Sequence, residues 1–173
     1  MLAGDLYIAD DPEIGADWEH RFSPQLSAKV VGVIIETSVD QDDAFRTFTL
    51  TGSGPGGLAN VQTINRTTQG GERVARGVLT WRPGPAHTVD VGVEGAFNFR
   101  DTTLDVANNN GSGAVPQFIA VADAKVEEER VEPFVTDVWK ISPQLTLETG
   151  FIFEASRITQ TGDESREREF SYP

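Results

Sequence analysis

The chain has 173 residues, a formal net charge of −13 and no cysteine. The negative charge argues against a nucleic-acid partner, because phosphate binding needs a cationic face. The lack of cysteine excludes disulfides, thiolate metal sites and thiol nucleophiles, and no run of 18 or more apolar residues is present to form a transmembrane helix. A transmembrane β-barrel remains compatible with this composition, since only every second residue of its strands faces lipid.

The amino-terminal segment carries none of the marks of a signal peptide. Its first twenty residues lack a basic start followed by an apolar stretch, and they include Asp10, Asp11 and Glu13 instead. An exported protein with this sequence is therefore expected to need further sequence upstream.

The chain is predicted to be all β. Helical periodicity is poor, whereas β-branched and aromatic residues gather in runs separated by Gly, Pro, Asn and Ser. Three short proline-bearing turns each join two such runs: Ser23-Pro24-Gln25, Pro83-Gly84-Pro85-Ala86 and Ser142-Pro143-Gln144. The sequence thus predicts three hairpins, over about residues 13–37, 72–100 and 131–157.

Long polar segments follow each of these hairpins. We expect loops over about residues 38–71, 101–130 and 159–167, because these segments contain Gly-rich, Asn-rich or acidic stretches. Short turns and long loops therefore alternate along the chain. This alternation is typical of an outer-membrane barrel, in which short turns lie on one rim and long loops on the other.

Apolar and polar residues alternate regularly in three of the predicted strands. Val89, Val91 and Val93, for example, share one face, and Asp90 and Glu94 share the other. Nine polar residues on these strands are expected to face the lumen of a barrel: Asp17, Glu19, Arg21, Asp90, Glu94, Asn98, Arg100, Glu148 and Glu154. The run from Leu26 to Thr37 alternates poorly, and Pro133 predicts a bulge or an early strand end.

Seven aromatic residues are expected at the membrane interfaces: Phe22, Trp81, Phe97, Phe99, Trp139, Phe151 and Phe153. Phe22, Trp81 and Trp139 lie within a few residues of a proline turn. Phe97 and Phe99 lie about ten residues beyond their turn, which corresponds to a rise of about 23 Å at roughly 3.3 Å per residue and a tilt near 45°. The alternative interpretation is that these aromatics pack in the core of a soluble sheet.

No combination of residues points to an enzyme. The two histidines, His20 and His87, lie beside the proline turns and are expected to be structural. The glycine-rich segment 52–57 lacks the Gly-Lys-Ser/Thr ending of a phosphate loop, and the acidic clusters at 40–43 and 127–129 match no EF-hand. We therefore expect no catalytic residue, no cofactor and no metal site.

The run from Arg130 to Gly150 resembles a recurring hairpin of TonB-dependent receptor barrels. An aromatic residue, Asp137 and Trp139 precede the short turn, and Leu145-Thr146-Leu147 follows it. The segments Gly77–Gly84 and Gly92–Asn98 are similar to the same family, and the resemblance covers about residues 13–173. Ile152 departs from the pattern, since a basic residue is expected there.

The resemblance implies a Gram-negative outer-membrane receptor with a barrel of about 22 strands, closed by a plug domain. Such a receptor imports a scarce nutrient, for instance a siderophore, cobalamin or a saccharide, with energy relayed by TonB. This chain would supply about six or seven up-and-down antiparallel strands of an incomplete transmembrane β-barrel, without the plug. Its implied partners are outer-membrane lipid, the rest of the barrel, the plug domain, TonB through that plug, and an unidentified cargo. The alternative function is a soluble or surface β-rich binding or adhesion module.

Overall fold

The computed structural model describes residues 2–120 and 122–173, and every regular element in these residues is a β-strand. The described part of the chain contains no helix that could cross a membrane. In chain order the strands are β1 (Leu2–Asp10), β2 (Glu13–Ser23), β3 (Leu26–Thr51), β4 (Gly54–Gly84), β5 (His87–Asn109), β6 (Ala114–Pro116), β7 (Asp123–Ser142), β8 (Leu145–Ile152), β9 (Glu154–Gly162) and β10 (Arg166–Tyr172).

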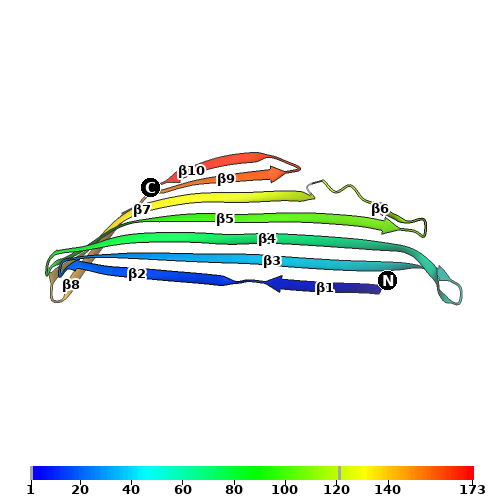
Figure 1. Cartoon of the computed structure of the whole chain (residues 1–173), viewed down its shortest axis with the longest axis horizontal. Coiled ribbons are helices and arrows are strands. Elements are labelled where there is room, and N and C mark those ends of the chain that lie inside the picture. The colour runs from blue at the N-terminus through cyan, green and yellow to red at the C-terminus, as the bar shows by residue number, and fades with distance from the viewer. Residues whose placement is uncertain (1, 121) are drawn as a thin grey trace.

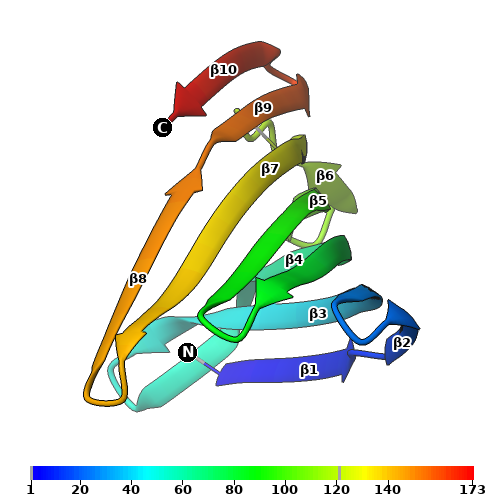
Figure 2. The same ribbon diagram turned by 90° about the vertical axis from the view of Figure 1, so that its left-hand side faces the viewer.

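The strands form one antiparallel sheet, which confirms the predicted all-β antiparallel fold (Figure 1). The ten strands occupy seven strand positions across the sheet, because three positions each hold two strands placed end to end. These are β1 with β2, β6 with β7, and β8 with β9. These interruptions explain why there are more strands than the six or seven predicted. The sheet is open, with β1 and β2 along one edge and β8 and β10 along the other (Figure 2).

Two prolines account for two of these three interruptions. The Glu36 N–H donates to the Pro12 carbonyl between β1 and β2, and the Phe153 N–H donates to the Pro133 carbonyl between β8 and β9, both at 3.0 Å. Proline has no N–H with which to complete either ladder. The predicted bulge or strand end at Pro133 is wrong, because β7 keeps its register with β5 through the Val93–Pro133 pair. The interruption lies instead in the neighbouring strand position, between β8 and β9.

The three proline turns lie at one end of the sheet (Figure 1). Two of them share the sequence Ser-Pro-Gln and the same hydrogen bond. The Gln25 N–H donates to Ser23 Oγ at 3.1 Å, and the Gln144 N–H donates to Ser142 Oγ at 3.3 Å. A serine hydroxyl that accepts from the backbone two residues later stabilises a tight turn, so the repeated tripeptide forms the same local structure twice.

The segments predicted as long loops are mainly strand. Residues 38–71 continue β3 and β4 up to a turn at Gly52 and Ser53, residues 101–130 include the end of β5, β6 and the start of β7, and residues 159–167 include the end of β9 and the start of β10. In these segments, polar side chains form hydrogen bonds from one strand to the next. Thr67 Oγ1 donates to Asp40 Oδ1 at 2.9 Å, and Asn60 Nδ2 donates to Asn108 Oδ1 at 3.2 Å. These strands are polar because no apolar layer covers either face, and polarity alone does not indicate a loop.

Candidate functional site: two faces of different chemistry

The strand register gives the sheet an apolar face. Leu79, Val91 and Val135 are cross-strand partners on β4, β5 and β7, so their side chains share this face, and they are 40–51% exposed. On the neighbouring strands, every second residue near the proline turns has its side chain on this same face. The apolar band, as we define it, includes Ile14, Ala16, Trp18, Val30, Ile34, Ala75, Leu79, Trp81, Val89, Val91, Val93, Phe97, Val131, Val135, Trp139, Leu147 and Phe151.

A row of charged side chains ends the apolar band. These residues lie on the same face, farther from the proline turns, and we call them the charged belt: Glu36, Arg73, Glu127, Glu129, Arg157, Glu167 and Glu169. Arg73 bonds Glu36 at 3.2 Å, and Arg157 bonds Glu167 at 2.9 Å. The belt was missed in the sequence analysis. In each alternating strand, the first charged residue at a position where an apolar residue is expected could have revealed the belt.

Just beyond the belt, Lys125 bonds Glu127 at 2.7 Å. This hydrogen bond, together with the negative charge of Glu127, raises the pKa of Lys125 above its ordinary value. This ion pair adds one more pair of charges to the border of the apolar band.

The predicted interface aromatics lie on the apolar face. Trp81, Trp139 and Phe22 lie at its turn end, and Phe97 and Phe99 lie beside the charged belt. Phe151 and Phe153 lie in between, opposite Val135 and Pro133. The chain's three tryptophans are Trp18, Trp81 and Trp139, and all of them are on this face.

One carboxylate lies within the apolar band. Asp137 on β7 is the cross-strand partner of Val89, and its Oδ2 bonds His87 Nδ1 at 2.9 Å. The His87 ring stacks on Trp139 with 5.4 Å between ring centroids. Asp137 Oδ1 is buried, and it has no hydrogen-bond partner among the described residues. His87 thus provides the partner that keeps this carboxylate on an otherwise apolar surface.

The opposite side of the sheet is a polar face. The register places all nine polar residues singled out in the sequence on this face, although their environments differ. Asp90, Glu94, Asn98 and Glu154 are partly buried, whereas the three β2 residues, Arg100 and Glu148 are exposed. Ile152 also lies on this face, opposite Phe134. The three buried side chains among the described residues, Thr68, Ala96 and Phe134, are on the same side.

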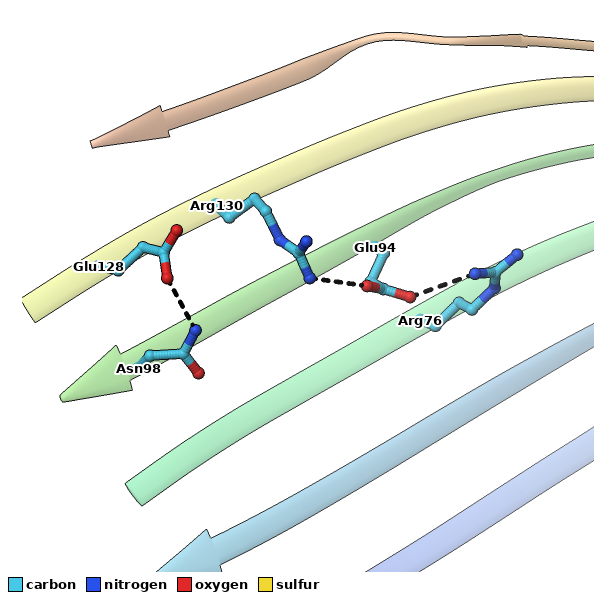
Figure 3. A network of polar contacts seen from close by, with 5 residues as sticks. All are labelled: Arg76, Glu94, Asn98, Glu128 and Arg130. Atoms are coloured by element: carbon cyan, nitrogen blue, oxygen red, sulfur yellow. Dashed lines mark hydrogen bonds and ion pairs between the residues drawn. The ribbon is translucent and has the colours of Figure 1, made fainter. Parts of the chain in front are cut away.

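An ion-pair network connects three strands on the polar face (Figure 3). Glu94 on β5 accepts from Arg76 on β4 at 3.2 Å and from Arg130 on β7 at 3.3 Å. Four residues farther along β5, Asn98 donates to Glu128 at 3.0 Å. Of these five residues, only Glu94 and Asn98 were predicted to face the lumen, and Glu128 was noted only as part of the acidic cluster 127–129. The other three could be found only once the register of β4, β5 and β7 was known.

A cross-strand apolar row within the polar face explains the poor alternation of the β3 sequence. Val33, Val74 and Ala96 are successive cross-strand partners on β3, β4 and β5. Phe134 pairs with Gly92, four residues along β5 from Ala96, and the guanidinium of Arg76 is 4.4 Å from its ring centroid. The apolar residues on both faces of β3 thus reflect a small packed layer on the polar side.

A groove of about 1190 Å³ crosses the sheet from β2 to β10. Three adjacent cross-strand rows line it, and two of these carry their side chains on the apolar face. Its floor holds small residues, among them Gly32, Ala75 and Gly95, beside Arg73 and Glu129. Since the groove extends over the whole width of the sheet, it is an open surface trough and not an enclosed pocket.

Comparison with known proteins does not assign the chain to a family: no protein-family model matches it. No curated protein shows significant sequence similarity to it. Among the described residues, no group of three or more His, Asp or Glu side chains is placed to hold a metal ion. The chemistry of the site therefore rests on the two faces of the sheet.

Proposed function

We propose that this chain is a membrane-spanning wall segment of an outer-membrane β-barrel, in a nutrient receptor of the TonB-dependent kind. The observation that carries the proposal is the apolar band, which is bounded by the proline turns on one side and by the charged belt on the other. The charged belt begins ten residues from the turn end of the band: Glu36 is ten residues after Leu26 on β3, and Glu129 is ten residues before Trp139 on β7. Ten residues rise about 23 Å in a barrel strand tilted near 45°, close to the height of a barrel's lipid-facing band.

The exposed fractions of the apolar side chains agree with a lipid-facing wall. Ile14, Trp18 and Phe151 are 70%, 53% and 57% exposed. A contiguous apolar surface of this size is unfavourable in water and marks a contact with lipid or another protein. In this proposal the polar face lines the lumen and the plug domain covers it. The strand segments beyond the charged belt, β3 and β4 above all, form the polar wall outside the membrane.

The proposal is tested by tryptophan fluorescence in vesicles whose lipids carry bromine on the acyl chains, because bromine quenches tryptophan on contact. The full chain is refolded into brominated and ordinary phosphatidylcholine vesicles. We expect strong quenching, since Trp18, Trp81 and Trp139 all lie on the apolar face. The control is a Ser27→Trp variant in which those three tryptophans are replaced by phenylalanine. Ser27 lies at the level of Trp81 on the polar face and is expected to escape quenching.

Two results would contradict the proposal. The first is equal quenching of the control and the parent chain, which would show that the faces do not differ toward lipid. The second is a monomer in plain buffer that melts cooperatively and is not quenched by vesicles. That result would favour a soluble or surface β-rich binding module, in which another layer covers the apolar face.

A further inference from the structure

The charged residues at the turn end of the sheet are all basic. Within three residues of the three proline turns, which lie together at this end (Figure 1), the sequence contains arginine, lysine and histidine but no aspartate or glutamate. All 27 acidic residues of the chain lie elsewhere, although they outnumber the 14 lysines and arginines over the whole sequence. The turn end therefore has a charge opposite in sign to the net charge of the protein. We call its non-histidine bases the cationic rim: Arg21, Arg82 and Lys140.

Each member of the cationic rim is next in sequence to an aromatic residue at the turn end of the apolar face. The pairs are Arg21 with Phe22, Arg82 with Trp81, and Lys140 with Trp139. The three aromatic residues are 57%, 51% and 41% exposed. Aromatic side chains at the border of a lipid-facing band lie at the level of the lipid headgroups. The bases beside them are therefore at headgroup level as well.

The side chains of the cationic rim are available to a ligand. All three residues are exposed, and none forms an ion pair within residues 2–120 and 122–173. The strand register shifts between residues 21 and 23, 81 and 84, and 140 and 142, so the regular alternation of faces ends there. Long basic side chains at such a border extend along the apolar surface and place their charged groups among the headgroups.

The acids closest to the rim along two of the strands have partners of their own. Asp90 is the first acid of β5, and it accepts from Thr80 at 2.6 Å. Asp137 is the last acid of β7, and it bonds His87 at 2.9 Å. Among the described residues neither carboxylate forms an ion pair with the rim, so the positive charge of the rim is not neutralised by them.

The two borders of the apolar band thus carry opposite charge. The charged belt contains five glutamates and two arginines, whereas the cationic rim contains three bases and no acid. Guanidinium and ammonium groups bind phosphate through charge-assisted hydrogen bonds. An anionic membrane surface attracts each nearby Lys or Arg by a factor of about five. The charge of the rim therefore fits an anionic headgroup.

We infer that the cationic rim binds the headgroups of anionic phospholipids in the leaflet on the turn side of the membrane. The inference rests on the proposed function, which puts the rim at headgroup level. It also goes beyond that function, because a lipid-facing apolar band needs only acyl chains and does not distinguish one headgroup from another. The rim adds a preference for a phosphate whose charge no cation of the same headgroup offsets.

The test measures which lipid surrounds Trp81 and Trp139, the neighbours of two rim bases. The full chain carries Trp18→Phe, so that these are its only tryptophans. It is refolded into phosphatidylcholine vesicles in which about one tenth of the lipid is phosphatidylglycerol. In one preparation only the phosphatidylglycerol carries bromine on its acyl chains. In the other, the same fraction of the phosphatidylcholine carries it instead.

We expect brominated phosphatidylglycerol to quench about three times as strongly as the same amount of brominated phosphatidylcholine, because a fivefold local preference raises a one-tenth component to about a third of the neighbouring lipid. Substituting all three rim bases with glutamine, as Arg21→Gln/Arg82→Gln/Lys140→Gln, should make the two lipids quench equally. The conservative variant Arg21→Lys/Arg82→Lys/Lys140→Arg keeps the charge and should keep the excess.

The matched control removes the same charge from the same part of the chain without touching the rim. It is Arg46→Gln/Arg66→Gln/Arg100→Gln, with one substitution on each of β3, β4 and β5. These three arginines are exposed, form no ion pair among the described residues, and lie beyond the charged belt from the turns. The control should keep the excess quenching by phosphatidylglycerol.

Equal quenching by the two brominated lipids before any rim substitution would overturn the inference. So would an excess that survives the glutamine variant of the rim, or one that the control loses as well. A measurement that needs no variant of the rim is the effect of salt: about 1 M NaCl shortens the Debye length to about 3 Å and should remove the excess, so an excess that salt leaves unchanged also overturns the inference.

Quenching in vesicles made entirely of brominated lipid is recorded in parallel. Strong quenching there without an excess for phosphatidylglycerol rejects the headgroup preference alone. Absence of quenching there rejects the membrane proposal, and the inference with it.

Discussion

The ring of Phe134 on β7 lies over Gly92 on β5, its cross-strand partner on the polar face. A Cβ at position 92 would overlap Phe134 Cζ and would come within 2.6 Å of the Gly77 carbonyl oxygen. An aromatic ring that covers a glycine of the neighbouring strand fixes the register of the pair. In this protein the pair also supports the cation–π contact of Arg76 with the same ring.

Replacing Gly92 with alanine should destabilise the folded chain by about 1–3 kcal/mol, because the new methyl group overlaps an aromatic ring and a carbonyl oxygen. The free energy of unfolding is measured by denaturant titration in detergent micelles. Gly95→Ala on the same strand is the control, since the nearest atom to its Cβ would be the Arg130 carbonyl oxygen at 3.9 Å. Equal losses for the two variants would show that Phe134 does not occupy this space.

Replacing Glu94 with glutamine should cost about 1 kcal/mol, because Arg76 and Arg130 both lose their carboxylate partner. Glu36→Gln is the matched control, as it removes one ion pair with Arg73 at a similar distance of 3.2 Å. The Glu94 side chain is 19% exposed and that of Glu36 is 53% exposed, so the control should lose less than about 0.5 kcal/mol. A larger loss for Glu36→Gln than for Glu94→Gln, in the same titration, would contradict this order.

Replacing Val135 with lysine should destabilise the chain in vesicles by about 2 kcal/mol, because it puts a charge on the lipid-facing band. Thr136→Lys places the same side chain one residue away on the polar face, opposite Asp90, and should be tolerated. The comparison is made by denaturant unfolding from lipid vesicles. If Thr136→Lys is the more harmful change, the assignment of the two faces is reversed.

Replacing His87 with leucine should cost about 1–3 kcal/mol, because Asp137 loses its hydrogen-bond partner within the apolar band. Adding Asp137→Val to this variant should restore most of the stability, since no unpaired polar group then remains. Unfolding of the single and double variants in micelles measures the difference. An additive loss in the double variant would mean that the two residues act independently.

Much of the fold could be read from local patterns. The Ser-Pro-Gln turns, the alternation from Val89 to Phe99 and the aromatics near the turns are properties of neighbouring residues, and the structure shows the strands and the shared face that they predict. The polar segments 38–71 and 101–130 were predicted to be loops, but they are mainly strand. Their strands are stabilised by partners such as Asp40 with Thr67, which are far apart in the sequence.

The sequence by itself determined that the chain is β-structured and two-faced, because period-two alternation assigns a side chain to a face without reference to any neighbour. Only the tertiary structure decided which side chains meet. The charged belt, the network around Glu94 and the His87–Asp137 pair each join residues of different strands, and their assembly depends on register. A shift of one residue between two strands would move one strand's side chains to the opposite face and separate the pairs that join those two strands, so the site depends on the register of every strand pair.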